Sequence, residues 1–118
     1  MDLYTPEQFE RLLENGRKSQ KANAKGALFD PEPVVKWFAP FGSATWLITE
    51  IYPDDPSIAF GLADLGLGFP EFGDISVFEI QSITGPAGLK IERDLYFKAD
   101  RPLSEYASEA RRRGYIAA

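Results

Sequence analysis

The sequence has no cysteine and no histidine among its 118 residues. The absence of cysteine excludes disulfide bonds, thiol nucleophiles and thiolate zinc sites. The absence of histidine removes the commonest metal ligand and the side chain best suited to proton transfer near neutral pH. Any catalytic chemistry would therefore depend on carboxylates, lysine, tyrosine or hydroxyl groups, and we expect neither a metal ion nor another cofactor.

The chain also lacks a long hydrophobic run. No apolar segment approaches the roughly 20 residues that span a bilayer, and the first residues show no signal-peptide core. Hydrophobic residues make up 44% of the sequence and aromatic residues 14%, which is typical of a globular protein. We therefore expect a single cytoplasmic domain over residues 1–118 without a membrane contact.

Acidic residues outnumber basic ones and give a formal net charge of −5. The excess lies in residues 29–100, whereas both ends of the chain are mildly basic. An acidic surface repels nucleic-acid phosphates and attracts basic proteins, although solubility alone also explains such a balance. The charge favours a protein partner with a basic surface and no direct nucleic-acid binding, and it leaves the oligomeric state open.

Helix signals lie near both ends of the chain. Thr5 and Gln8 fit a capping box, which predicts a helix that begins at Pro6 and stops at Asn15-Gly16. Residues 17–28 carry no apolar periodicity and predict a mobile basic linker or loop. Residues 102–113 predict a C-terminal helix with one buried stripe, formed by Leu103, Tyr106, Ala107 and Ala110.

Between these helices, β-branched and aromatic runs predict strands over residues 34–38, 44–52, 57–65 and 89–97, separated by proline and glycine turns. Ser76 and Glu79 fit a second capping box and predict a short helix near residues 77–83. Nothing in the order of elements calls for a parallel sheet. The predicted class is α+β, with an antiparallel sheet of about four strands, an N-terminal helix, a short middle helix and a C-terminal helix.

Residues 61–73, GLADLGLGFPEFG, resemble a phosphate-binding loop only in their glycine content. Glu71 stands where a GxGxxG motif needs its third glycine, and no lysine follows before Lys90. The sequence therefore excludes a nucleotide loop. Two interpretations remain: Phe69 and Phe72 fold inward over the sheet edge, or they point outward and contact a partner.

Two acidic residues continue the apolar rows of predicted strands. Glu50 follows Trp46 and Ile48, and Asp64 follows Phe60 and Leu62, in alternating positions. Side by side, the two would form a carboxylate pair in a hydrophobic cleft, usable by a hydrolase or for a hard cation.

The alternative interpretation of these acids is that each sits at a strand end and reaches water. A second acidic group, Asp54 and Asp55 with Asp30 and Glu32, lacks the spacing of a calcium loop and is better explained by turn chemistry.

Five segments together resemble a family of small bacterial proteins, the domain of unknown function 2958. They are Glu32–Lys36, PFGSATWLITE (40–50), IAFGLADLGLGFP (58–70), IERDLYF (91–97) and PLSEYASEA (102–110). Members of that family often occur on plasmids, phages and other mobile elements. The resemblance implies this setting and supports the fold, and it implies no catalytic residue or cofactor.

Three functions follow as hypotheses. The first is a non-enzymatic interaction protein of a mobile element, such as a counter-defence inhibitor of the anti-CRISPR or anti-restriction type, that acts through its acidic surface on a nucleic-acid-binding protein. Its contacts would be four acids with two aromatic anchors between them: Asp54, Asp55, Glu71 and Asp74, with Phe69 and Phe72. The second is a small hydrolase or metal-dependent enzyme that uses Glu50 and Asp64. The third is an accessory domain that packs on a larger partner.

Overall fold

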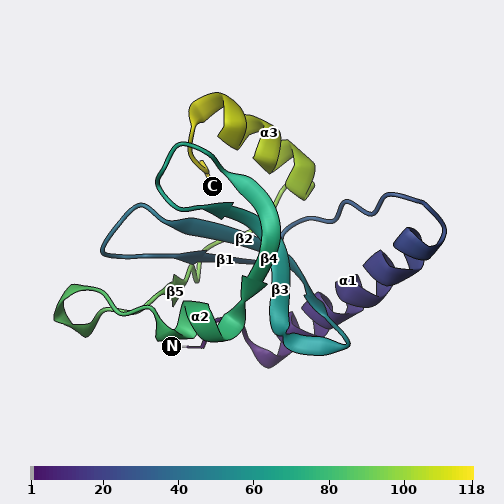
Figure 1. Ribbon diagram of the computed structural model, residues 1–118, viewed down its shortest axis with the longest axis horizontal. Helices are drawn as coiled ribbons and strands as arrows, with labels where there is room; N and C mark the ends of the chain where they lie inside the picture. The colour runs from purple at the N-terminus through teal and green to yellow at the C-terminus, as the bar shows by residue number, and fades with distance from the viewer. Residues whose placement is uncertain (1) are drawn as a thin grey trace.

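Five antiparallel strands form one sheet in the order β4-β3-β2-β1-β5 in the computed structural model, which describes residues 2–118 (Figure 1). The strands are β1 (Val35–Phe38), β2 (Thr45–Tyr52), β3 (Asp55–Asp64), β4 (Glu71–Ser76) and β5 (Glu92–Arg93). The helices are α1 (Pro6–Ala24), α2 (Val77–Ser82) and α3 (Leu103–Arg113), with a 3-10 turn η1 (Pro86–Gly88). The α+β class and the three helices are therefore confirmed. Nowhere in residues 2–118 does a helix combine the length and apolarity needed to cross a membrane.

The sheet separates two hydrophobic cores. On its first face, α1 and α2 bury a cluster that includes Leu12, Trp37, Ile48, Ile51 and Ile80. On its second face, α3 buries a smaller cluster, so that α3 lies on the opposite side of the sheet from α2 in Figure 1. The second cluster contains the predicted stripe of α3 together with Leu47, Leu62 and Ile116.

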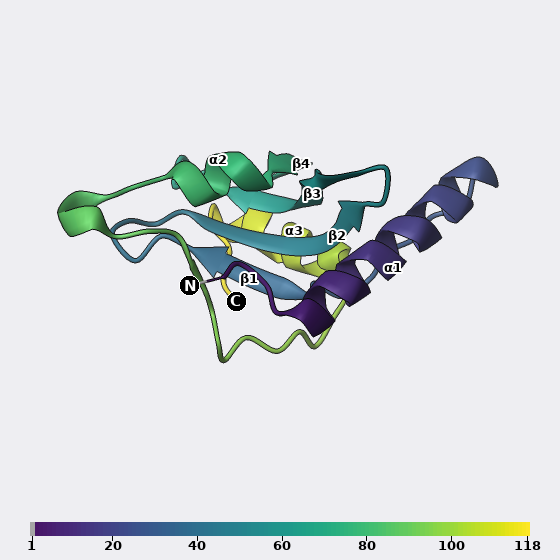
Figure 2. The same cartoon turned by 90° about the horizontal axis from the view of Figure 1, so that it is seen from below.

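Helix α1 begins where the capping box predicts. The Thr5 hydroxyl accepts from the Gln8 N–H at 3.0 Å, and the Gln8 side chain accepts from the Thr5 N–H at 2.9 Å. The predicted stop at Asn15-Gly16 and the predicted linker that follows are wrong, because the helix continues to Ala24. Figure 2 shows its second half extending past the sheet.

Asn15 and Gly16 pack α1 on the sheet instead of ending it. Strand β1 pairs with β2 only as far as Ile48, so the last part of β2 has a free edge. The Asn15 side-chain amide donates to the Thr49 carbonyl at 2.9 Å across that edge, and Gly16 lies against the Ile51 carbonyl, where a Cβ would be 2.1 Å from its oxygen. Only glycine permits an approach this close.

Two strands differ from expectation. Strand β4 occupies the glycine-rich stretch and pairs with β3 from Ala63↔Glu71 to Ile58↔Ser76, so Gly73 sits opposite Gly61 inside the sheet. The strand expected over residues 89–97 is reduced to β5, because the Asp94 carboxylate accepts from the Tyr96 N–H at 2.9 Å and turns the chain.

Candidate functional site

Helix α3 covers only part of the second face of the sheet. The uncovered part carries Glu50 and Tyr52 from β2, Phe60 from β3, and Phe72 and Asp74 from β4. Glu50 pairs with Phe60, and Phe60 pairs with Asp74, so these three residues form one rung across the sheet. Paired residues of antiparallel strands point to the same face, and the rung therefore sets two carboxylates on either side of an aromatic ring.

A bulge places Glu50 on this face. The pairing of β2 with β3 shifts between Ile48 and Glu50, which leaves Thr49 as an extra residue. After the bulge the alternation is reversed, so Ile48 and Ile51 both pack in the first core while Glu50 turns to the second face. The predicted row of Trp46, Ile48 and Glu50 on one face is therefore wrong.

Two adjoining cavities lie over the open half of the sheet. The larger, of about 470 Å³, is walled by the end of α1 through Ser19, Gln20 and Asn23. The smaller, of about 300 Å³, reaches the start of α3. Both are lined by Leu28, Phe29, Glu50 and Phe60. We call these two cavities together the acidic groove.

Glu50 is the most buried acid of the acidic groove, with 6% of its surface exposed. Desolvation by burial raises the pKa of its carboxyl above the ordinary value, hydrogen bonding to the Ser19 hydroxyl opposes this, and the charge of Asp74 raises it further. No cationic side chain of residues 2–118 forms an ion pair with the Glu50 carboxylate. The groove thus contains a desolvated carboxylate that has no ion pair with a lysine or arginine of residues 2–118.

The other acids of the site are exposed and held by neutral donors. The Tyr52 hydroxyl donates to Asp74, which raises the pKa of that hydroxyl to about 12. At the mouth, Gln20 donates to the Asp54 carboxylate at 3.1 Å, and Asp55 accepts from the backbone and hydroxyl of Ser57. These contacts fix the positions of the carboxylates and leave their charge in place.

Asp64 lies at the other end of the second face. It pairs with Thr45, four residues along β3 from Phe60, which corresponds to roughly 13 Å of strand. Its carboxylate is 2% exposed and accepts from the backbone N–H groups of Gly66 and Ile116, each at 2.9 Å. The structure therefore does not bring Glu50 and Asp64 together, and Asp64 fastens the C-terminal segment to the end of β3.

Of the two aromatic residues in the glycine-rich stretch, Phe69 points outward and Phe72 partly so. Phe69 is 79% exposed, whereas Phe72 is 41% exposed, stacks on Phe60 with 6.2 Å between ring centroids, and lies under the Arg111 guanidinium. Both rings line a further hollow with Glu71. Phe72 also lines the smaller cavity of the acidic groove and so connects the hollow with the groove, whereas Glu71 pairs with Ala63, which packs against the first core.

The comparisons with known proteins identify a family without a known activity. The sequence pattern of the family described as "Protein of unknown function (DUF2958)" matches residues 3–117. The chain belongs to the DUF2958 family. No curated protein and no solved structure matches it.

Sequence reasoning on this DUF2958 protein missed much of the wall of the groove. Ser19 and Asn23 fell in the predicted linker, and Phe29 had no pattern that marked it. One signal was present, because residues 17–24, RKSQKANA, consist mostly of good helix formers. Giving these propensities more weight than the missing apolar stripe would have extended α1.

The lining of the DUF2958 site combines negative charge with apolar area. Residues 2–118 contain no group of three or more acidic side chains close enough to hold a metal. The lining combines carboxylates with an aromatic floor and side-chain amides, and none of the lysines and arginines in the described part of the chain lines either cavity. Such a surface attracts positive charge and offers apolar contact area.

Proposed function

We propose that this DUF2958 protein is a non-enzymatic interaction protein whose acidic groove binds a basic protein partner. One observation carries the proposal: Glu50, Asp54 and Asp55 line the groove together with Phe60, Asp74 pairs with Phe60 on the sheet, and none of the four acids forms an ion pair with a cation of residues 2–118. Charges left unpaired in this way steer a partner of opposite sign and speed its association.

The glycine-rich loop extends this surface with apolar area. Leu65, Leu67 and Phe69 are exposed on the loop that follows Asp64, at the end of the second face away from the groove, and large exposed apolar side chains that gather on one side of a protein mark interaction sites. Aromatic residues dominate the binding energy of such sites. We therefore propose that the acids speed association with the partner, and that Phe69 and Phe72 slow its dissociation.

The resemblance to proteins of mobile elements suggests what kind of protein this partner would be. A counter-defence protein must neutralise a host enzyme that binds nucleic acid, and such enzymes carry basic surfaces. An acidic groove competes for that surface without contacting nucleic acid itself. We therefore propose an inhibitor of this type as the biological setting of the interaction.

The test is affinity capture with charge-reversed variants. The tagged protein is expressed in a bacterium that encodes it, and captured proteins are eluted with increasing salt and identified by mass spectrometry. The pair Asp54→Lys with Asp55→Lys reverses the mouth of the groove. The pair Glu10→Lys with Glu79→Lys makes the same change in net charge at two exposed acids outside the groove, and serves as control.

We expect a basic protein in the wild-type and control captures that is lost from the groove variant and elutes as salt screens the attraction, over a Debye length of about 10 Å at 0.1 M. Circular dichroism verifies that each variant is folded. Equal capture by all three proteins, or a partner without a basic surface, would contradict the proposal.

The rung of Glu50, Phe60 and Asp74 favours one second candidate, a carboxylate-based hydrolase. Two strand spacings place the Cα atoms of the two acids roughly 10 Å apart, and the raised pKa of Glu50 suits a general acid. Glycosidases use such pairs. Hydrolysis of chromogenic glycosides that is lost in both Glu50→Gln and Asp74→Asn would support this candidate, and no hydrolysis by the wild type would remove it.

A further inference from the structure

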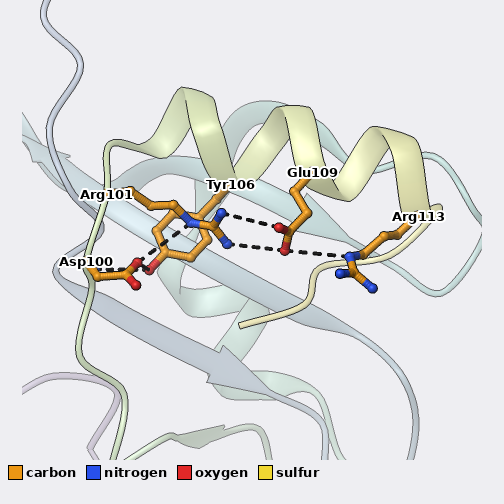
Figure 3. Close-up of polar contacts among 5 residues, drawn as sticks. All are labelled: Asp100, Arg101, Tyr106, Glu109 and Arg113. Carbon is orange, nitrogen blue, oxygen red and sulfur yellow. Dashed lines mark hydrogen bonds and ion pairs between the residues drawn. The ribbon is translucent and has the colours of Figure 1, made fainter.

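The guanidinium group of Arg101 is held by an aromatic ring and a carboxylate of the same chain. Arg101 lies with its guanidinium carbon 4.4 Å from the centroid of the Tyr106 ring (Figure 3). Its two terminal nitrogens donate to the two carboxylate oxygens of Glu109 at 3.3 and 3.2 Å. Arg101 thus combines an aromatic ring below the cation with a forked carboxylate contact at its edge.

The acidic groove contains the same components without the cation. Phe60 lines both cavities and supplies the aromatic ring, the part that Tyr106 has beside Arg101. Glu50 lies beside Phe60 on the same rung, is 6% exposed, and faces both cavities without an ion pair to residues 2–118. A positive partner in the cavity would offset the solvation that such a buried carboxylate loses when it is ionised.

We propose that the acidic groove binds the guanidinium group of one arginine side chain of the basic partner, laid on the Phe60 ring and paired with the Glu50 carboxylate. This inference rests on the proposed function, because it names the contact through which that partner is recognised. Asp54 and Asp55 at the mouth attract the cation, and the apolar side chains of Leu28 and Phe29 cover its aliphatic stem.

Arginine fits the groove better than lysine for three reasons. Its flat guanidinium stacks on an aromatic face, its fork contacts both oxygens of a carboxylate, and its weak hydration lowers the free energy needed to enter a half-buried site. Lysine carries a compact and strongly hydrated charge, which would keep water between itself and Glu50.

The test uses capped amino acids and needs no partner protein. Isotope-labelled protein is titrated with N-acetyl-arginine amide and followed by two-dimensional ¹H–¹⁵N NMR. Two comparison ligands are the citrulline analogue, which has nearly the same shape without the charge, and the lysine analogue. The variants are Glu50→Gln and Phe60→Leu, with Glu79→Gln as a matched control on α2, outside the groove. The spectra also report whether each variant is folded.

We expect the arginine ligand to shift the amide signals of residues around Glu50 and Phe60. Affinity should fall about tenfold in Glu50→Gln and roughly threefold in Phe60→Leu, and stay unchanged in Glu79→Gln. The citrulline analogue should cause no shift, and the lysine analogue should bind more weakly.

Three results would overturn the inference: no shift at the groove, equal binding by Glu50→Gln or the citrulline analogue, or lysine binding as tight as arginine. The proposed function fails separately, when affinity capture yields no basic partner although the capped arginine still binds.

Discussion

Replacing Gly16 by alanine tests the packing that places α1 beside the groove. In an exposed part of a helix this change stabilises a protein by about 1 kcal/mol. Here the new Cβ would lie 2.1 Å from the Ile51 carbonyl oxygen and 2.9 Å from Cδ of Pro53, so α1 and β2 must separate. Overpacking of this kind costs about 1–3 kcal/mol. Because one of the opposing atoms is backbone, we take the upper end and expect a net loss of about 2 kcal/mol.

The loss is measured as the free energy of unfolding in urea, and it corresponds to a fall in Tm of roughly 8 °C. Gly42→Ala is the matched control, because nothing lies within 4 Å of its added Cβ and its φ is ordinary. The control should stay within about 0.5 kcal/mol of the wild type. A Gly16→Ala protein that is more stable than the wild type would refute the close approach of α1 to β2.

Three further predictions concern stability. Thr5→Ala removes a capping contact to Gln8 and should lower the unfolding free energy by about 1 kcal/mol, and an unchanged Tm would refute the role of this cap. Asp64→Asn weakens the contacts to two backbone N–H groups and should cost about 2 kcal/mol in urea unfolding, with faster hydrogen exchange at Ile116; unchanged exchange would contradict this anchor. Burial raises the pKa of Glu50 in the folded state, so the folded protein loses stability as pH rises through that pKa and the carboxyl ionises. Glu50→Gln should therefore raise the unfolding free energy by on the order of 1 kcal/mol at pH 7 and leave it unchanged below the unfolded-state pKa. An equal gain at both pH values would refute the assignment.

Local signals predicted the elements whose residues interact with near neighbours in sequence. The cap at Thr5 depends on residues three positions apart, and the buried stripe of α3 follows from helical periodicity. Both appear in the structure as predicted. The turn between β2 and β3 and the short helix α2 belong to the same group, because a proline at Pro53 and a capping serine at Ser76 mark them directly.

Contacts between distant residues decided what the sequence could not predict. In the sequence Gly16 predicts a helix stop, and only the Ile51 carbonyl beside it in the structure explains why a glycine stands there. Residues 71–76 have the glycine and acidic content of a loop, and only their pairing with β3 makes them strand β4. The bulge at Thr49 reverses the direction of Glu50, and it is stabilised by Asn15 from α1 and by a contact of the Thr49 hydroxyl with the Phe60 carbonyl.

The arrangement of the candidate site could not be predicted from the sequence. Asp54, Asp55 and Phe69 are exposed, which for Phe69 decides between the two interpretations that the sequence left open, and their contact with a partner stays a prediction. The acid on the same rung as Glu50 is Asp74 rather than Asp64, because both Glu50 and Asp74 pair with Phe60 of β3. Register of this kind depends on the whole sheet and is not readable from one strand.

The most direct test of the acidic groove as a cation site is the pKa of Glu50 itself, measured by ¹³C NMR of its carboxyl with and without N-acetyl-arginine amide. The groups that face it are Asp74 and Tyr52 from the sheet, Ser19 from α1, and Asp54 and Asp55 at the mouth. We expect a pKa above the ordinary value in the free protein and a lower pKa with the ligand bound, because a guanidinium stabilises the ionised carboxylate. An ordinary pKa in the free protein that the ligand leaves unchanged would contradict the account.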